Sequence, residues 1–524
     1  MMMMKPMFDE GVREAQSIDD LLAQIDRTDL LKEVNSEDSY AVNLKIDEIL
    51  SLIDRKDIVA EVEPEEQYAV TSEDEAELER AYALPKAQKS YKIAMFAWES
   101  MHSIAVGEVA PHVTNVASAL EKRGHEVHVY VRTGKDQGTY ENVDGVHVHR
   151  VSFELCENFV QEVENMCNVM VTEFFNTERF MGSQFDIVHC HDWLAAPVLL
   201  NLKKYHDRYC VFTVHSTEFG RCGNNFYGGQ SEAIRGIEAE AINVANRVIA
   251  VSGVLCDELK EHNQFDWRNL RCVPSGIDIL PYDGELWDPA YIRGFYKVGP
   301  LDPMVLYNGK MVGEKGPDIL IDAVPMLLAS RPDAKFVMVG DGYMKDELIG
   351  RCASMGISGS VIFPGALTGR QLVELYKTTD VVCMPSRSEP FGMVALEAWA
   401  SSKPVVATNC GAPREFIAHD KDGFVVDANP EGIAWGVGTI FANFDHARWM
   451  GTQGQMKAAD DFSWIRIAEK TNEVYDQMTG FTPRRMGRMS AVESKAKKAE
   501  KKKRKQRKVQ ENAAVAFLSK MVGA

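Results

Sequence analysis

Apolar residues between positions 90 and 478 form short strand-like runs that alternate with segments of helix length. The runs are KIAMFAWE (92–99), HEVHVYVR (125–132), FDIVHCHD (185–192), CVFTVHS (210–216), RVIAVS (247–252), MVLYNGKM (304–311), KFVMVGDG (335–342), SVIFPG (360–365), DVVCMPS (380–386) and PVVATNCG (404–411). Strands that alternate with helices predict parallel sheets with helices on both faces. The pattern therefore predicts an α/β protein with two doubly wound, Rossmann-like halves.

The Pro- and Asp-rich segment 280–303 separates the two series of runs and is the predicted connection between the halves. This gives an N-terminal Rossmann-like domain at 90–295 and a C-terminal one, with closing helices, at 296–480. Ligands of doubly wound sheets bind at the carboxyl ends of the strands. The cleft between the halves is therefore the expected active site.

Segments outside these halves differ in charge from the middle of the chain. The formal net charge is −19, which argues against a surface that generally coats nucleic acid. Residues 1–90 hold 23 acidic and 10 basic side chains, a net of −13, whereas 484–508 hold 13 basic and 2 acidic, a net of +11. We therefore expect an acidic extension at 1–89 and a basic tail at 481–524.

The acidic extension contains an internal repeat. Residues 18–42 recur as 46–70 with 13 of 25 positions identical, and their apolar residues have helical spacing after a predicted N-cap at Ser17. Two copies are too few for a self-supporting solenoid. The repeat is interpreted either as a solvated acidic extension or as an element for a protein partner or self-association.

The basic tail also has several interpretations. A lysine run is commonly a solvated face or tail, but it could contact polyanions, a membrane surface or the acidic N-terminal region. Residues 513–522 could form a small docking helix. Ten scattered cysteines without a C-x-x-C pair indicate a reducing compartment, and no apolar run approaches the roughly 18 residues of a membrane span. We expect a cytoplasmic protein without a transmembrane segment.

The stretch SRSEPFGMVALEAWA (386–400) places Glu389 and Glu397 on either side of a Phe-Gly step. It is predicted to follow a buried strand and to begin a helix near Met393. Unpaired N–H groups at a helix start attract phosphate, and Gly392 lets the backbone approach a ligand closely. One carboxylate could then bind sugar hydroxyls and the other ribose hydroxyls.

The stretch YNGKMVGEKG (307–316) lies in a predicted loop between a strand and a helix. Lys310 and Lys315 are ordinary surface lysines if they point apart. If they converge, they would neutralise charge that develops on a leaving nucleotide diphosphate. The VGDG turn at 339–342 fits a nucleotide-facing loop but is a weak signal alone.

Other chemistries fit the sequence less well. HCHD (189–192) and HVHR (147–150) have the alternating spacing of a strand, but such histidines more often serve the core, and no metal is expected. A serine hydrolase would need a G-x-S-x-G elbow. A retaining glycoside hydrolase could use Glu389 and Glu397, but the paired lysines would have no role in it.

From about 92 to 478, these motifs in this order resemble retaining glycosyltransferases with the GT-B fold, families 4 and 5, which include glycogen and starch synthases. GKMVGEKG (309–316) resembles the basic donor-phosphate loop, and EPFGMVALE (389–397) resembles the E-x7-E motif. VHCHDW (188–193) and FTVHSTEFGR (212–221) resemble synthase segments. The N-terminal half would then bind the acceptor and the C-terminal half the nucleotide sugar.

The resemblance implies roles for individual residues. Lys310 and Lys315 would clamp the diphosphate, Glu389 would contact the donor glucose and Glu397 the ribose. The remaining implied site residues are His215 and Asp192 beside the donor sugar, the glycine loops at Gly107 and Gly309, and the backbone N–H groups of Phe391, Gly392 and Met393 at the sugar hydroxyls.

Two positions depart from the family pattern. Lys310 stands where arginine is usual, which keeps the charge but loses a bidentate fork. The common Gly-Gly step is here Gly107-Glu108. A carboxylate near a diphosphate is unfavourable, so Glu108 either points away or the acceptor pocket differs from that of a typical synthase.

The function that the resemblance implies is transfer of glucose, with retention, from ADP- or UDP-glucose to the non-reducing end of an α-1,4-glucan. The resemblance implies that no cofactor or metal is needed. Same-face attack, in which the leaving phosphate takes the acceptor proton, would also make a nucleophilic side chain unnecessary. Alternatives are another family 4 transferase with a sucrose-, trehalose-, glycan- or lipid-type acceptor, and an inactive scaffold that binds nucleotide sugars.

Overall fold

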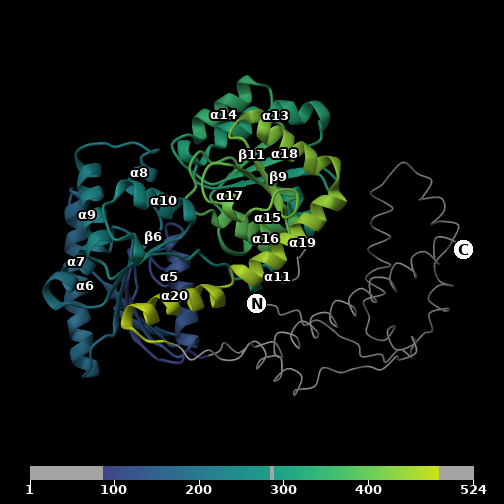
Figure 1. Ribbon diagram of the computed structural model, residues 1–524. Coiled ribbons are helices and arrows are strands. Elements are labelled where there is room, and N and C mark those ends of the chain that lie inside the picture. The colour runs from purple at the N-terminus through teal and green to yellow at the C-terminus, as the bar shows by residue number, and fades with distance from the viewer. Residues whose placement is uncertain (1–85, 284–287, 483–524) are drawn as a thin grey trace, which may run out of the picture. The chain divides into compact units, whose positions relative to one another are not determined.

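The computed structural model describes residues 86–283 and 288–482. The predicted repeats at 18–42 and 46–70 and the basic tail from 483 onward lie outside these residues. Two parallel-stranded sheets, each covered by helices, form two lobes of one compact unit (Figure 1). The prediction of a two-domain α/β fold is confirmed.

The first lobe contains an eight-stranded sheet of order β3-β4-β2-β1-β5-β6-β7-β8, parallel except for the β3–β4 pair. Its strands are β1 (Lys92–Phe96), β2 (Glu126–Arg132), β3 (Tyr140–Val143), β4 (Val146–Val151), β5 (Ile187–His191), β6 (Cys210–Val214), β7 (Arg247–Ala250) and β8 (Leu270–Cys272). Its helical elements are α5 (Val109–Lys122), α6 (Phe159–Met181), α7 (Ala196–His206), α8 (Glu218–Arg221), α9 (Gln230–Val244), α10 (Gly253–His262) and the 3-10 turn η2 (Trp267–Asn269).

The second lobe contains a six-stranded parallel sheet of order β11-β10-β9-β12-β13-β14. Its strands are β9 (Met304–Asn308), β10 (Lys335–Val339), β11 (Val361–Gly365), β12 (Val381–Met384), β13 (Val405–Thr408) and β14 (Gly423–Val426). Its helical elements are η3 (Gly313–Lys315), α13 (Pro317–Ser330), α14 (Lys345–Ser354), α15 (Gly369–Thr378), α16 (Met393–Ala400), α17 (Pro413–Phe416), α18 (Pro430–Ala442) and α19 (Phe444–Asp461).

The connection between the lobes is partly helical, with α11 (Leu280–Asp283) and α12 (Pro289–Phe295) inside the predicted linker. Arg293 ties α12 to the second lobe. Its buried guanidinium donates hydrogen bonds to the carbonyl oxygens of Thr378 at 2.6 Å and of Gly299 at 3.2 Å. Hydrogen bonds from one charged group to several carbonyls fix a connection firmly.

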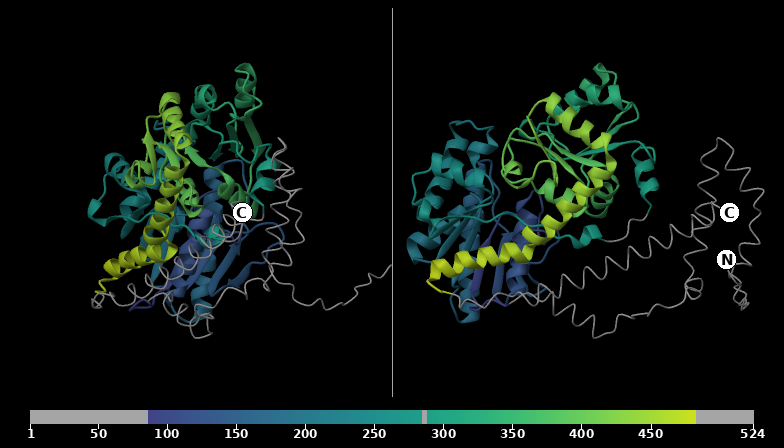
Figure 2. Two further views of the ribbon diagram at one scale, coloured as in Figure 1. Left: turned by 90° about the vertical axis from the view of Figure 1, so that its right-hand side faces the viewer. Right: turned by 45° about the vertical axis from the view of Figure 1, so that its right-hand side comes forward.

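The final helix, α20 (Trp464–Thr479), packs against α5 of the first lobe although it follows the second lobe in sequence. Figures 1 and 2 show it, in yellow, lying along the first lobe. Its Trp464, Ile467 and Tyr475 join the same apolar cluster as Ile93 of β1. The Tyr475 hydroxyl also lies 2.7 Å from His189 Nδ1. The chain therefore crosses between the lobes twice.

Among the residues that the structure describes, no helix has both the length and the apolar composition that a membrane crossing requires.

Candidate active site

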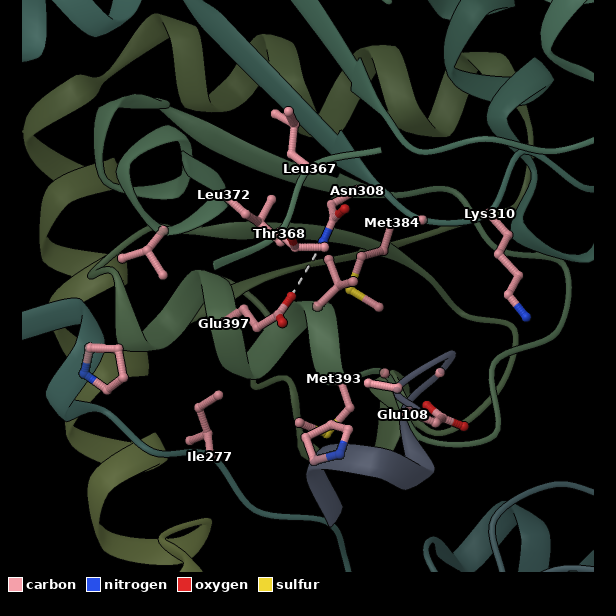
Figure 3. A pocket seen from close by; sticks show the side chains of 18 of the residues that line it. Glu108, Ile277, Asn308, Lys310, Leu367, Thr368, Leu372, Met384, Met393 and Glu397 are labelled. Atoms are coloured by element: carbon pink, nitrogen blue, oxygen red, sulfur yellow. Dashed lines mark hydrogen bonds between the residues drawn. The ribbon is translucent and has the colours of Figure 1, made fainter. Parts of the chain in front are cut away.

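The carboxyl ends of β9 and β12 and the start of α5 contribute to a cleft of about 860 Å³. This is where doubly wound sheets bind their ligands. Figure 3 shows side chains from both lobes around it. The structure brings most of the predicted site residues to its wall: Gly107, Gly309, Lys310, Lys315, Glu389, Gly392, Met393 and Glu397.

An ion pair at the centre of the second-lobe wall joins the two predicted motifs. Lys315 Nζ donates to Oε1 of Glu389 at 2.9 Å and to Oε2 at 2.8 Å. Ser386 adds a hydrogen bond of 3.1 Å to Glu389 Oε2. Burial disfavours the charged form of Lys315, but Glu389 and Glu108 outweigh this effect and raise the pKa of the lysine. Lys315 is therefore a fixed cation at neutral pH.

Close backbone contacts hold these loops in place. Gly316 has φ +60°, and a Cβ there would lie 2.1 Å from the carbonyl oxygen of Pro385. The backbone N–H of Arg387 bonds to the carbonyl of Glu314 at 2.8 Å, and its side chain pairs with Asp318. The lysine loop and the glutamate loop are thus fastened to each other, which is the pre-organisation that electrostatic catalysis needs.

The helix α16 begins at the cleft, as predicted from the sequence. Gly392 precedes its first residue with φ +103°, a conformation that favours glycine. Because glycine has no side chain to cap the helix, the N–H groups of Met393 and Val394 are left for a ligand. The Ala395 N–H donates to the Gly392 carbonyl at 3.0 Å. The Phe391 side chain is buried against Phe416 and Phe462, so only its backbone could contribute to the site.

Glu397, one turn into α16, also lines the cleft, and Figure 3 shows its carboxylate pointing toward Asn308. Its Oε2 accepts hydrogen bonds from the Tyr376 hydroxyl at 2.6 Å and from Asn308 Nδ2 at 3.5 Å. Burial raises the pKa of Glu397, and these two donors partly offset the effect. Neither Tyr376 nor Asn308 was predicted. Asn308 directly precedes Gly309 in a predicted loop, whereas Tyr376 carries no sequence signal.

Asp192 and His215 lie together at the ends of β5 and β6, buried rather than on the described cleft wall. The His215 backbone N–H donates to Asp192 Oδ1 at 2.7 Å, and Asp192 has φ +57°. Burial raises the pKa of Asp192 to about 6, opposed by Arg221 and by backbone N–H groups. Burial lowers the pKa of His215 to about 3, so its ring is neutral.

Three buried histidines, His112 of α5, His191 and His215, come together, with candidate ligand atoms within 4.8 Å of one another. His191 Nδ1 is 3.2 Å from His215 Nε2, and His112 Nδ1 is 3.0 Å from Ser275 Oγ. Burial lowers the pKa of His112 and His191 well below the usual range. Neutral imidazoles are the form that ligates metals, so these rings could hold a cation, which the sequence did not lead us to expect. His189 instead serves the core, bonded to Tyr475 and Thr213.

Glu108 lines the cleft and does not point away from it. The loop before it is held by Glu99, a buried residue whose Oε2 accepts hydrogen bonds from the N–H groups of Val106 at 2.6 Å and Gly107 at 2.9 Å. Burial raises the pKa of Glu108 to about 7, and Lys315 only partly offsets this effect. The first alternative drawn from the sequence, in which Glu108 points away from the site, is therefore wrong.

Two Rossmann-like lobes with a basic loop and an E-x7-E helix start facing one cleft define a glycosyltransferase with the GT-B fold. Residues 109–279 match Glycosyltransferase Family 4, and residues 295–456 match Glycosyl transferases group 1. An uncharacterised glycosyltransferase of Methanocaldococcus jannaschii is 35% identical over 73% of this chain and 97% of its own length. The chain belongs to this family of glycosyltransferases, of the glycogen-synthase-like type.

Characterised relatives differ in what their names say they act on. A glycogen synthase of Mycobacterium tuberculosis is 27% identical over 73% of this chain and 94% of its own length. A D-inositol 3-phosphate glycosyltransferase of Segniliparus rotundus is 25% identical over 74% and 90%. Sucrose-phosphate synthase of Thermosynechococcus elongatus, a solved structure, shares the fold with a TM-score of 0.63, 21% identity and coverage of 74% and 99%.

Proposed function

We propose that this glycosyltransferase moves glucose, with retention, from ADP- or UDP-glucose to the non-reducing end of an α-1,4-glucan. The observation that carries the proposal is the Lys315–Glu389 pair beside the start of α16. A partly buried cation and a helix N-terminus together form a site for a diphosphate, and a carboxylate beside them suits sugar hydroxyls. A hydrolase would have no use for the cation.

Each of the site residues would have a separate role in the transfer. Lys315 and Lys310 would neutralise the charge that develops on the leaving diphosphate. Glu397, oriented by Tyr376, would accept hydrogen bonds from the ribose hydroxyls. Neutral His215 is buried behind the cleft wall, so it would position the donor sugar through the residues that line the cleft. The leaving phosphate oxygen would take the proton of the acceptor hydroxyl as that hydroxyl attacks from the same face. The two lysines would supply the positive charge that the leaving diphosphate needs, so no cofactor or metal would take part.

The acceptor proposal is drawn from the named relatives and from the charges of the cleft. The M. tuberculosis glycogen synthase supports a glucan, whereas the S. rotundus relative supports an inositol phosphate. The cleft, about 860 Å³ in volume, is of the size that binds small ligands. The two acidic residues of its first-lobe wall, Glu108 and Asp278, favour a neutral glucan over an anionic acceptor.

Donor and acceptor profiling tests the proposal. ADP-, UDP- and GDP-sugars are each incubated with glycogen, maltotriose, inositol 3-phosphate or no acceptor, and products are identified by anomeric proton NMR. We expect an α-linked extension of glycogen or maltotriose from ADP- or UDP-glucose. An inverted product would contradict retention, and transfer to inositol 3-phosphate alone would contradict the glucan assignment.

A further inference from the structure

Glu108 is the one acidic residue that stands at the entrance of α5 and on the wall of the cleft. It directly precedes Val109, the first residue of that helix, and its side chain makes no hydrogen bond that caps the helix. Figure 3 shows its carboxyl group at the helix start, on the same side of the view as Lys310. A helix N-terminus ordinarily favours an anionic ligand. Here the protein's own carboxylate lies where such a ligand would approach.

The first-lobe wall of the cleft carries no compensating positive charge. Among the described residues of 86–279 that line the cleft, the charged ones are Glu108 and Asp278, and lysine and arginine are absent. The cations of the wall belong to the second lobe. They are Lys310, Lys315 and Arg370. Lys315 is paired with Glu389, Arg370 is paired with Glu374 at 2.6 Å, and Lys310 acts electrostatically on Glu108. An anion on the acceptor side would therefore meet two carboxylates and no unpaired cation from its own lobe.

We propose that Glu108 is a specificity-determining residue that restricts this enzyme to neutral, hydroxyl-bearing acceptors and rejects acceptors that carry a phosphate. This proposal rests on the proposed function and names the acceptor class for it. The carboxylate repels a phosphate monoester across the first-lobe wall, and it accepts hydrogen bonds from the hydroxyls of a neutral sugar. Rejection by an unfavourable charge is an efficient source of specificity, because it acts only on the wrong ligand.

The selectivity depends on the ionisation of Glu108. The groups that face it are Lys310 and Lys315 from the loop after β9, Glu389 from the loop after β12, and Asp192 at the end of β5. The pKa of about 7 places the ionisation within the physiological range. Rejection of an anionic acceptor therefore strengthens as the pH rises from 6 to 8, and neutral acceptors are affected less.

The test compares two acceptors that differ by one fixed charge. Maltotriose and maltotriose sulfated at O6 of its non-reducing glucose are titrated calorimetrically into the full-length protein, with and without nucleoside diphosphate. A sulfate ester stays singly charged from pH 6 to 8, so any pH dependence belongs to the protein. The variants are Glu108→Gln, Glu108→Gly and the control Glu121→Gln. Glu121 lies near the other end of α5, about 20 Å away at 1.5 Å per residue.

The wild type should bind the sulfated sugar at least about tenfold more weakly than maltotriose at pH 8. Glu108→Gln and Glu108→Gly should reduce the ratio of maltotriose affinity to sulfated-sugar affinity about tenfold and remove its pH dependence. Glu121→Gln should change neither the ratio nor its pH dependence. A wild-type ratio near one, an unaltered ratio in a folded Glu108 variant, or no binding of either sugar would each overturn the proposal. ADP and UDP are each titrated alone into the same protein, and absence of binding for both would instead overturn the proposed donor, independently of the acceptor ratio.

Discussion

In the proposed function Lys315 contacts both the Glu389 carboxylate and the donor diphosphate. An ammonium group has three N–H donors. Glu389 occupies it through two oxygens, at 2.9 and 2.8 Å. The third N–H can therefore contact a diphosphate while Glu389 keeps its place beside the proposed sugar site.

Lys315→Met should lower kcat by roughly 100-fold or more, since a single electrostatic donor at a developing charge typically contributes this much. The substrate KM should change less. Lys335→Met, which removes a lysine bonded to the carbonyl of Gly359 at the start of β10, is the control and should keep wild-type rates. Initial-rate kinetics of both variants decide the point. Similar kcat values for the two would show that Lys315 does not stabilise the leaving group.

Substitutions of Glu389 and Glu397 should impair different steps of the reaction. Glu389→Gln removes the charge beside Lys315 but spares the helix start, so sugar transfer should fall while nucleoside diphosphate binding stays near wild type. Glu397→Gln loses a charged acceptor for hydroxyl donors, and nucleotide affinity should fall about tenfold. Calorimetric titration of the free nucleoside diphosphate, beside rate assays, distinguishes them. The same profile in both variants would contradict the division of roles.

Glu108 should also affect stability in a pH-dependent way. Its folded pKa, about 7, lies above the ordinary value of 4.5, so between these values the folded state binds more protons than the unfolded state. Stability from this group is therefore present at low pH and is lost as pH rises toward 7. Glu108→Gln should raise Tm relative to wild type at pH 8 and much less at pH 5, measured by calorimetry. An equal gain in Tm at both pH values would show that the Glu108 carboxyl does not ionise near pH 7.

At the scale of elements, continuous apolar runs were sufficient to locate the central strands. β1, β5, β6, β9, β10, β12 and β13 each lie within a predicted run. Buried parallel strands need apolar residues on both faces, and this requirement makes the run visible. The weakly apolar β3, with Tyr140, Glu141 and Asn142, was missed because its side chains are exposed. Residues Tyr140–Val143 form a strand because they pair with β4. The local sequence pattern does not reveal this pairing.

The same limit applies to the site. Lys315, Glu389 and Glu397 lie in two local motifs at strand ends, and a doubly wound sheet binds its ligands at the carboxyl ends of its strands. Their position at one cleft could therefore be predicted, whereas the adjacency of β9 and β12 comes from the structure. Tyr376 lies on α15 and reaches Glu397 only through tertiary packing. The three-histidine cluster joins α5, β5 and the end of β6, and its members come from segments of different patterns. Contacts between non-adjacent elements are therefore what the sequence leaves out.

The join between the lysine loop and the glutamate loop depends on Gly316. Gly316→Ala adds both backbone strain at φ +60° and a clash, because the new Cβ would lie 2.1 Å from the Pro385 carbonyl oxygen. Gly356→Ala is a matched control in the same lobe, with φ +70° and no atom within 4 Å. Gly356→Ala should lower the free energy of unfolding by only roughly 1 kcal/mol, through backbone strain alone. Gly316→Ala should lower Tm further and reduce kcat, because the two loops must separate. Equal Tm values would show that the contact is dispensable.

On the scale of the molecule, α20 makes the two lobes depend on each other. The helix belongs by sequence to the second lobe, yet Trp464, Ile467 and Tyr475 lie in the core of the first. The backbone of Ile277 bonds to the carbonyl of Phe462 at 2.8 Å, beside the start of the helix. Both crossings between the lobes therefore run close together. Relative motion of the lobes, which would exclude water during transfer, must bend the chain at this pair of crossings.

Shortening the chain at two different points tests this arrangement. A chain of residues 86–482 keeps every described element and every proposed site residue, so it should retain Tm and turnover on maltotriose. A chain of residues 86–462 loses α20 and exposes the α5 face that Ile467 and Tyr475 cover. Loss of large buried side chains costs roughly 3–5 kcal/mol each, so this chain should unfold or melt far below the longer one.

Tyr475→Phe and Tyr475→Ala refine the comparison within the full chain. The first keeps the ring and loses only the hydroxyl contact to His189, so its Tm should fall slightly, whereas the second leaves a cavity and should fall much further. Thermal melts and circular dichroism measure all four proteins. If the chain of residues 86–482 fails to fold, the terminal segments belong to the core. If the chain of residues 86–462 melts like the longer one, α20 is a surface attachment and the lobes are independent of it.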